Sequence, residues 1–132
     1  TFLFSKAAAA VMAKHTYGRI VNMSSVSAKR GGGVFGGAHY SAAKAGILGF
    51  AKALAREVAA DGITVNSVAP GFLSTEMNEE MDARQTRQIV NRTPMGRLGN
   101  TRDVAELVGY LASPAADFIT GQVIAVDGGI TC

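Results

Sequence analysis

Residues 40–44 read Tyr-Ser-Ala-Ala-Lys and open a stretch, from about 41 to 60, whose pattern predicts a helix. In a helix, Tyr40 and Lys44 lie one turn apart on the same face, so an ammonium group sits beside a phenol. The positive charge favours the phenolate, and such a tyrosine can exchange a proton with a substrate oxygen near neutral pH. Taken alone the spacing is a weak signal, because it also arises by chance.

The same predicted helix, which ends at Asp61-Gly62, has two distinct kinds of surface. Its larger apolar side chains are expected to face the core: Ile47, Leu48, Phe50, Leu54 and Val58. Small residues gather elsewhere on it: Ala42, Ala45, Gly46, Gly49 and Ala53. A glycine in a helix interior costs about 1 kcal/mol relative to alanine, so we expect another backbone to approach this small-residue face closely.

Three short apolar runs predict strands, and helical patterns separate them. The strands are expected at 19–23, 63–69 and 122–126, and the other helices at 1–14, about 77–91 and from Asn100 or Thr101 to Ala112. Strands that alternate with helices predict an α/β fold with about three parallel strands and helices on both faces of the sheet. Residues 24–39 are rich in Ser and Gly and are predicted to form a long loop of the kind that often carries function.

Composition narrows the class of protein. With 132 residues, 48% of them hydrophobic and 17% charged, the chain fits one small globular domain rather than a disordered or coiled-coil protein. The 13 basic and 10 acidic residues are spread along the sequence, which argues against a nucleic-acid partner. No apolar run approaches the roughly 18 residues of a membrane span, and the lone Cys132 fits a reducing compartment. We therefore expect a cytoplasmic protein with neither a membrane nor a nucleic acid as partner.

Five segments, in this order, resemble the short-chain dehydrogenase/reductase family. They are GRIVNMSS at 18–25, YSAAKAG at 40–46, VNSVAPG at 65–71, GRLG at 96–99 with DVA at 103–105, and TG at 120–121 with VDGG at 126–129. The similarity covers nearly all of the chain and is greatest to the 3-oxoacyl-acyl-carrier-protein reductase branch and its alcohol dehydrogenase relatives. It implies the C-terminal part of a Rossmann-like, doubly wound parallel sheet, in an oxidoreductase that uses NAD or NADP and acts on a carbonyl/alcohol pair.

The resemblance also implies roles for particular residues. Ser25 corresponds to a hydrogen-bond donor to the substrate oxygen, Tyr40 to the general acid/base, and Lys44 to the residue that favours the phenolate and binds the nicotinamide ribose. Tyr40 and Lys44 also count among the cofactor-binding residues. The other cofactor-binding positions hold the nicotinamide end: Pro70, Gly71, the backbone of Leu73 and the hydroxyl of Thr75. The resemblance implies no metal site.

Each assignment has an alternative. Ser25 precedes Tyr40 by slightly more residues than is usual in the family, and Ser27 has the commoner spacing, although the NMSS match favours Ser25. Ser25 could instead be a loop residue or cap, and Thr75 only a helix cap. Pro70-Gly71 could be only a turn. His39, beside Tyr40, is expected to line the cleft rather than to act as a base.

The family's glycine-rich phosphate turn is not found in the sequence. Residues 1–132 are therefore expected to be one partial domain, the catalytic and substrate half, without the half that binds the dinucleotide phosphates, and to be inactive alone.

The substrate would be a small or acyl-carrier-bound carbonyl or alcohol. A homo-oligomer, dimer or tetramer, is expected to form through helices 1–14 and 41–60. The alternatives are an inactive interaction module and a relative of the sugar-nucleotide epimerases.

Overall fold

The computed structural model describes residues 1–32, 36–75 and 81–132. Its strands are β1 (Gly18–Met23), β2 (Ile63–Pro70) and β3 (Val123–Val126). Its α-helices are α1 (Phe2–Met12), α2 (Ser27–Arg30), α3 (Ala38–Val58), α5 (Ala83–Arg92) and α6 (Thr101–Ala112). Three short 3-10 helices complete the described part: Ala13–His15, Ala59–Asp61 and Pro114–Ala116.

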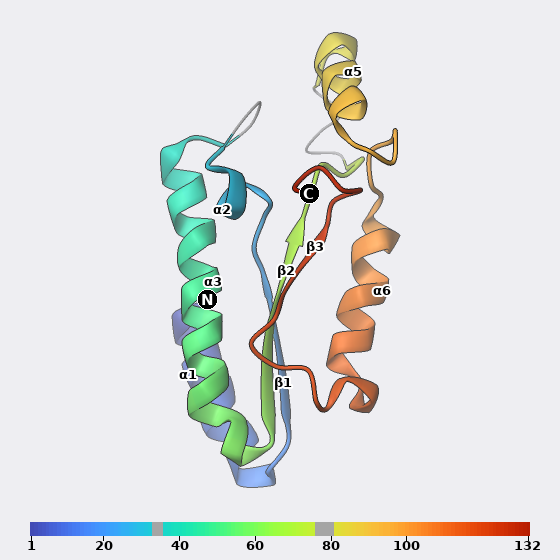
Figure 1. Ribbon diagram of the computed structural model, residues 1–132. Helices are drawn as coiled ribbons and strands as arrows, with labels where there is room; N and C mark the ends of the chain where they lie inside the picture. Colours follow the sequence, from blue (N-terminus) through green and yellow to red (C-terminus); the bar gives the residue numbers. More distant parts are fainter. Residues whose placement is uncertain (33–35, 76–80) are drawn as a thin grey trace.

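The three strands form one parallel sheet in the order β1-β2-β3, as predicted (Figure 1). In the register of the sheet Ile20 pairs with Val65, and Val68 pairs with Ile124. The central strand is buried along almost its whole length. Its polar Asn66 is satisfied, because its amide donates to the Ile119 carbonyl at 2.7 Å and its oxygen accepts from the Gln122 amide at 3.1 Å. Asn66 thereby fixes the turn that leads into β3.

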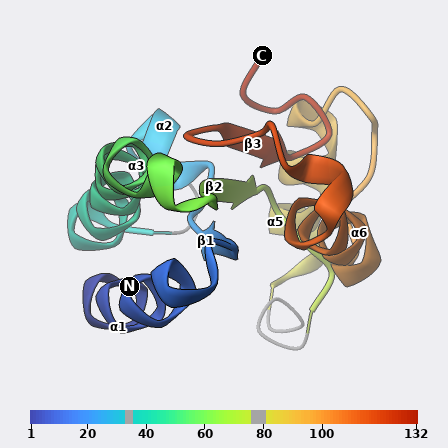
Figure 2. The ribbon, with the colours of Figure 1, turned by 90° about the horizontal axis from the view of Figure 1, so that it is seen from below.

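Helices cover both faces of the sheet. Figure 2 shows α1 and α3 on one side and α6 on the other. One core cluster joins α3 to the first face through Leu54, Val58 and Val65, and a second joins α6 to the other face through Val68 and Leu111. This is the two-sided architecture that the alternation of strands and helices predicted. Across residues 1–32, 36–75 and 81–132, no helix combines the length and the apolarity needed to cross a membrane.

The region from residue 24 to the start of α3 differs from the prediction in two ways. Helix α3 begins at Ala38 with Gly37 as its N-cap, so Tyr40 already lies in the first turn rather than before it. The stretch 24–39 is not all loop, because the short helix α2 lies within it. Both differences arise where one or two turns of helix carry no apolar periodicity that could be recognised in the sequence.

The later helices begin at clear signals. Asp82 caps α5 in a capping box with Gln85, and Asn100 caps α6 in the same way with Asp103. The start of α6 is as predicted. The helix expected from about 77 begins at Ala83, and residues 76–80 lie outside the described part.

Helix α3 buries only part of the apolar side that the sequence predicted and exposes its small-residue face. Leu54 and Val58 are buried as expected, whereas the other three large apolar residues are only half-buried. The small-residue face is exposed, and a Cβ built on Gly46 or Gly49 would meet no atom within 4 Å. The backbone expected to approach this face is therefore not among the described residues.

Candidate active site

The sequence-predicted site residues lie at the carboxyl ends of the strands. Because the sheet is parallel, β1, β2 and β3 all end at the same edge. Beyond β1 the chain stays attached to β2: the Ser24 amide donates to the Val68 carbonyl at 2.8 Å and the Val26 amide to the Pro70 carbonyl at 3.0 Å. Ser25 is thus held between two anchored residues at this edge.

The hydroxyl of Ser25 has a defined orientation. Its Oγ accepts a hydrogen bond from the Ser27 amide at 3.1 Å, and the side chain is largely buried. Within the described residues its proton has no acceptor, so the hydroxyl can donate to another oxygen. The same bond satisfies the first amide of α2, so Ser25 also helps to hold the loop before that helix, in keeping with the loop-residue alternative stated for it.

Tyr40 and Lys44 lie together on α3, as their spacing predicted. The Lys44 ammonium is 5.7 Å from the centroid of the Tyr40 ring and donates to the carbonyl of Met23 at 3.1 Å. The backbone carbonyl of Lys44 accepts from Ser24 Oγ at 2.8 Å. These two bonds tie the first turns of α3 to the end of β1 and hold the ammonium beside the phenol.

Gly36 determines where the Tyr40 ring can lie. A Cβ built on Gly36 would be only 2.8 Å from Cδ1 of Tyr40 and 3.4 Å from Ser27 Oγ. Its φ of +92° is also one that side-chain-bearing residues rarely adopt. The backbone of the loop therefore packs directly on the edge of the ring.

The segment after β2 is held at the same edge. The Gly71 amide donates to the Val126 carbonyl at 3.0 Å, and a Cβ on Gly71 would be 2.9 Å from Cα of Asp127. Further along, Leu73 forms a parallel bridge with Gly99. The backbone of this segment is thereby fixed between β3 and the start of α6.

One cavity of about 550 Å³ brings most of these residues together. Five predicted residues line it: Ser25, Tyr40, Gly71, Leu73 and Thr75. Lys44 and Pro70 are not among the lining residues. The Pro70 carbonyl accepts from the Val26 amide in the lining, and Lys44 is hydrogen-bonded to Met23 and Ser24, next to Ser25. His39 lines the cavity, as expected.

Sequence reasoning missed four lining residues, Val26, Gly36, Gly37 and Phe72, and named Ser27 only as the alternative to Ser25. Two of them are flanked by predicted residues along the chain and could have been found by continuity: Val26 follows Ser25, and Phe72 lies between Gly71 and Leu73. The glycines were assigned to a loop and not to the wall of a site.

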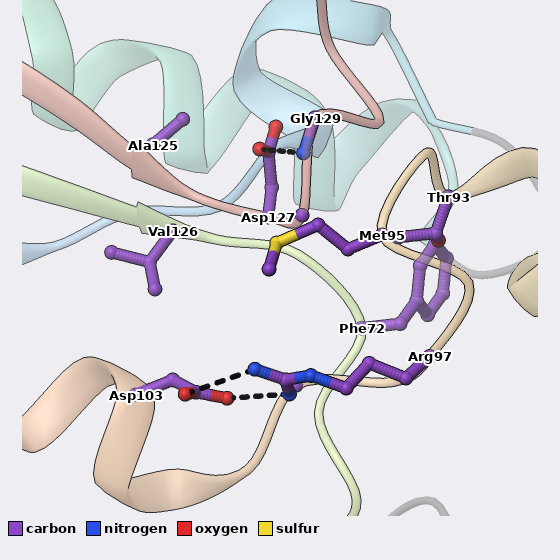
Figure 3. A pocket seen from close by; sticks show the side chains of 11 residues that line it. Phe72, Thr93, Met95, Arg97, Asp103, Ala125, Val126, Asp127 and Gly129 are labelled. Carbon is purple, nitrogen blue, oxygen red and sulfur yellow. Dashed lines mark hydrogen bonds and ion pairs between the residues drawn. The ribbon is translucent and has the colours of Figure 1, made fainter.

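A second cavity of about 390 Å³ lies beside the first and shares Phe72 with it. Figure 3 shows Arg97 facing Asp103 on one side and Asp127 turned toward the Gly129 amide on the other. The Arg97 guanidinium donates to both Asp103 oxygens, at 2.9 and 3.3 Å. These bonds, with one from the Asn100 amide, lower the pKa of the Asp103 carboxyl from its ordinary value.

Residues 1–131 match a family model described as enoyl-(acyl carrier protein) reductase. The chain belongs to the short-chain dehydrogenase/reductase family. A 3-oxoacyl-[acyl-carrier-protein] reductase of Vibrio cholerae is 46% identical over 129 residues, which are 98% of this chain and 52% of the relative. An uncharacterized short-chain type dehydrogenase/reductase of Sinorhizobium fredii is 53% identical over 114 residues, 86% of this chain and 45% of the relative. The chain thus spans about half the length of these relatives.

Solved structures confirm the Rossmann-like fold class. A 3-oxoacyl-[acyl-carrier protein] reductase from Brucella melitensis superposes with a TM-score of 0.93 at 38% identity, over 97% of this chain and 47% of that one. A putative gluconate dehydrogenase from Agrobacterium tumefaciens gives 0.92 at 32% identity, over 99% of this chain and 52% of that one. Members of this oxidoreductase family with differently named substrates therefore share the same arrangement of strands and helices.

Proposed function

We propose that this chain is the catalytic and substrate half of an NAD- or NADP-dependent oxidoreductase that interconverts a carbonyl and an alcohol. The observation that carries the proposal is the geometry of the first cavity. The hydroxyls of Ser25 and Tyr40 line one space at the carboxyl edge of the sheet, and the Lys44 ammonium lies 5.7 Å from the tyrosine ring. The activity and the full protein's substrates are inferred from this arrangement together with the names of the relatives.

In this proposal the three side chains have separate tasks. Ser25 donates its free hydroxyl proton to the substrate oxygen and so holds the carbonyl in place and stabilises the charge that develops on it. Tyr40 gives its phenolic proton to the same oxygen during reduction and takes it back during oxidation. Lys44, anchored on the Met23 carbonyl, stabilises the phenolate that forms when the proton leaves.

The residues present fit the nicotinamide end of the cofactor. The Lys44 ammonium uses one of its three donors on the Met23 carbonyl and keeps the others for a ribose hydroxyl, and the segment after β2 is fixed at the same edge of the sheet, next to the cavity that would hold the substrate. When bound, the nicotinamide supplies or accepts the hydride. A pyrophosphate is usually held by a glycine turn at a helix N-terminus, whereas Gly36 lies against Tyr40 and Gly37 against His39. We therefore propose that this chain alone is inactive and binds cofactor no better than at about millimolar concentration.

The proposed function is tested by replacing Tyr40 with phenylalanine in the full-length polypeptide. Tyr40→Phe removes the transferable proton while it leaves the ring against Gly36, so turnover should fall by about 10²- to 10⁴-fold with little change in cofactor affinity. Steady-state ketone reduction measures turnover, and fluorescence titration measures the cofactor Kd. Tyr17→Phe is the matched control, because that exposed tyrosine lies at the opposite edge of the sheet and should keep full activity. Turnover of Tyr40→Phe within threefold of wild type would contradict the acid/base role.

A second proposal, that the chain forms a homo-oligomer, rests on the outer surfaces of α1 and α3. Phe4 and Leu3 are 85% and 76% exposed on α1, and Phe2 packs edge-on against Phe50 of α3 with ring centroids 5.8 Å apart. The helix that carries Phe50 also has the open small-residue face. Exposed apolar side chains gathered on a surface mark an interface. We propose that a second copy of the chain covers this surface.

We also propose that the protein acts in the cytoplasm and that its substrate is a small or carrier-bound carbonyl or alcohol.

A further inference from the structure

One side chain of the cavity that holds Ser25 and Tyr40 is an imidazole to which no role has yet been given. His39 lies in the first turn of α3, immediately before Tyr40, and lines the same cavity. Apart from Tyr40, it is the one titratable side chain among the described residues that line this space. The imidazole offers an N–H donor and, when neutral, a nitrogen acceptor as well.

The imidazole is directed along the wall of the cavity. A Cβ built on Gly37 would lie 3.3 Å from both Nδ1 and Cε1 of His39, so the ring folds back over the N-cap of α3. Gly37 itself lines the cavity. Among the described residues no hydrogen bond or ion pair occupies the imidazole, and the side chain is exposed. Its ring nitrogens are therefore available to a ligand.

The position of His39 relative to Tyr40 sets what it can reach. Consecutive Cα atoms are about 3.8 Å apart, so two groups of one small substrate, separated by a few bonds, can contact neighbouring side chains at the same time. In the proposed reaction the hydroxyls of Ser25 and Tyr40 are both used by the reacting oxygen. His39 can then form a hydrogen bond with a second oxygen near the reacting carbonyl.

We propose that His39 determines substrate specificity by donating a hydrogen bond to a second oxygen of the carbonyl substrate, as in a 3-oxo ester or thioester. The inference rests on the proposed oxidoreductase function and adds a recognition residue to it. A simple ketone leaves the imidazole without a partner and gains nothing from it, whereas an oxygenated ketone gains one hydrogen bond. The preference should appear as a ratio of kcat/KM values for two ketones that differ only in that oxygen function.

The test compares ethyl acetoacetate with 2-heptanone, which has a backbone of the same length but only the reacting oxygen. The full-length polypeptide is assayed as wild type, His39→Leu and His39→Asn with NADH and NADPH. His39→Leu should lower kcat/KM for ethyl acetoacetate about tenfold, the value of one hydrogen bond, and leave that for 2-heptanone within about twofold. His39→Asn keeps an N–H donor and should recover most of the loss. His15→Leu, at the other histidine and at the opposite end of the sheet, should change neither value.

Each outcome has one meaning. If wild type prefers ethyl acetoacetate and only His39→Leu loses that preference, the inference holds. If His39→Leu changes neither rate, or changes both by the same factor, the inference is overturned while the proposed function stands. If wild type reduces neither ketone with either cofactor, the proposed function fails and the inference fails with it. His39→Ala gives the same comparison should the leucine variant not fold, which circular dichroism would show.

Discussion

Replacement of Gly36 by alanine should damage turnover through the position of the Tyr40 ring. The new Cβ would lie 2.8 Å from Cδ1 of Tyr40, and ordinary contacts begin at 3.4 Å, so the ring or the loop must move by 0.6 Å, the difference between the two. A misplacement of about 1 Å at a reacting group can cost about 100-fold. We therefore expect kcat to fall by about 10- to 100-fold. The φ of +92° adds a backbone strain of about 1–3 kcal/mol to the folded state.

The control separates displacement of the ring from strain. Gly31 also has a positive φ, +76°, but a Cβ there would meet no atom within 4 Å. Gly31→Ala should lower the thermal unfolding temperature in a similar way and leave kcat unchanged. Both variants are assayed for ketone reduction and for unfolding by circular dichroism. The reasoning is refuted if Gly36→Ala keeps kcat within threefold of wild type, or if Gly31→Ala loses as much activity.

Three further predictions follow from other contacts. Ser25→Ala should cost more turnover than Ser27→Ala, because the Ser27 amide orients Ser25 Oγ and survives in the alanine variant; steady-state kinetics showing the reverse order would move the donor role to Ser27. Asp103→Asn should lower the unfolding temperature near neutral pH, because the hydrogen bonds from Arg97 lower the pKa of the Asp103 carboxyl from 3.8. The ion pair stabilises the fold above that pH, and this stabilisation is lost as the pH falls through the pKa of the folded state. The difference in unfolding temperature between wild type and variant should shrink as the pH falls below 3.8, and a constant difference would exclude this charge effect. Gly49→Glu should shift the full-length protein toward monomer in ultracentrifugation at about 1 μM, because a second copy would place the charge against itself; an unchanged oligomer would place the interface elsewhere.

The order and type of the main elements could be predicted from the sequence because each carries a signal within its own residues. The runs that became β1 and β2 are apolar and short, and Asn100 with Asp103 forms a capping box that starts α6. The Tyr40 and Lys44 pair followed from helical spacing alone. The short helix α2 could not be predicted in the same way, since it is one turn long and its first amide is satisfied by Ser25 Oγ.

The walls of the candidate site depend on contacts between residues that lie in different segments. The side chains expected to do chemistry could be named from local motifs, but the sequence did not indicate that Gly36 and Gly37 would line the same cavity as the segment after β2. Lining depends on how the segment after β2 is held against Gly99, and that contact joins parts of the chain that no local pattern connects.

The glycines make the limit of local reasoning clear. A glycine in a sequence indicates that something approaches the backbone closely, but it does not say what. At Gly71 the neighbour is Asp127, remote in the sequence and adjacent in the sheet, whereas at Gly36 it is the ring of Tyr40, only four residues away. At Gly46 and Gly49 no described residue is close, although a helix interior that includes two glycines carries a cost of about 2 kcal/mol relative to alanine. The exposed face of α3 has no close neighbour among the described residues, so the proposed second copy would bring its backbone to these two glycines and add stabilising contacts there.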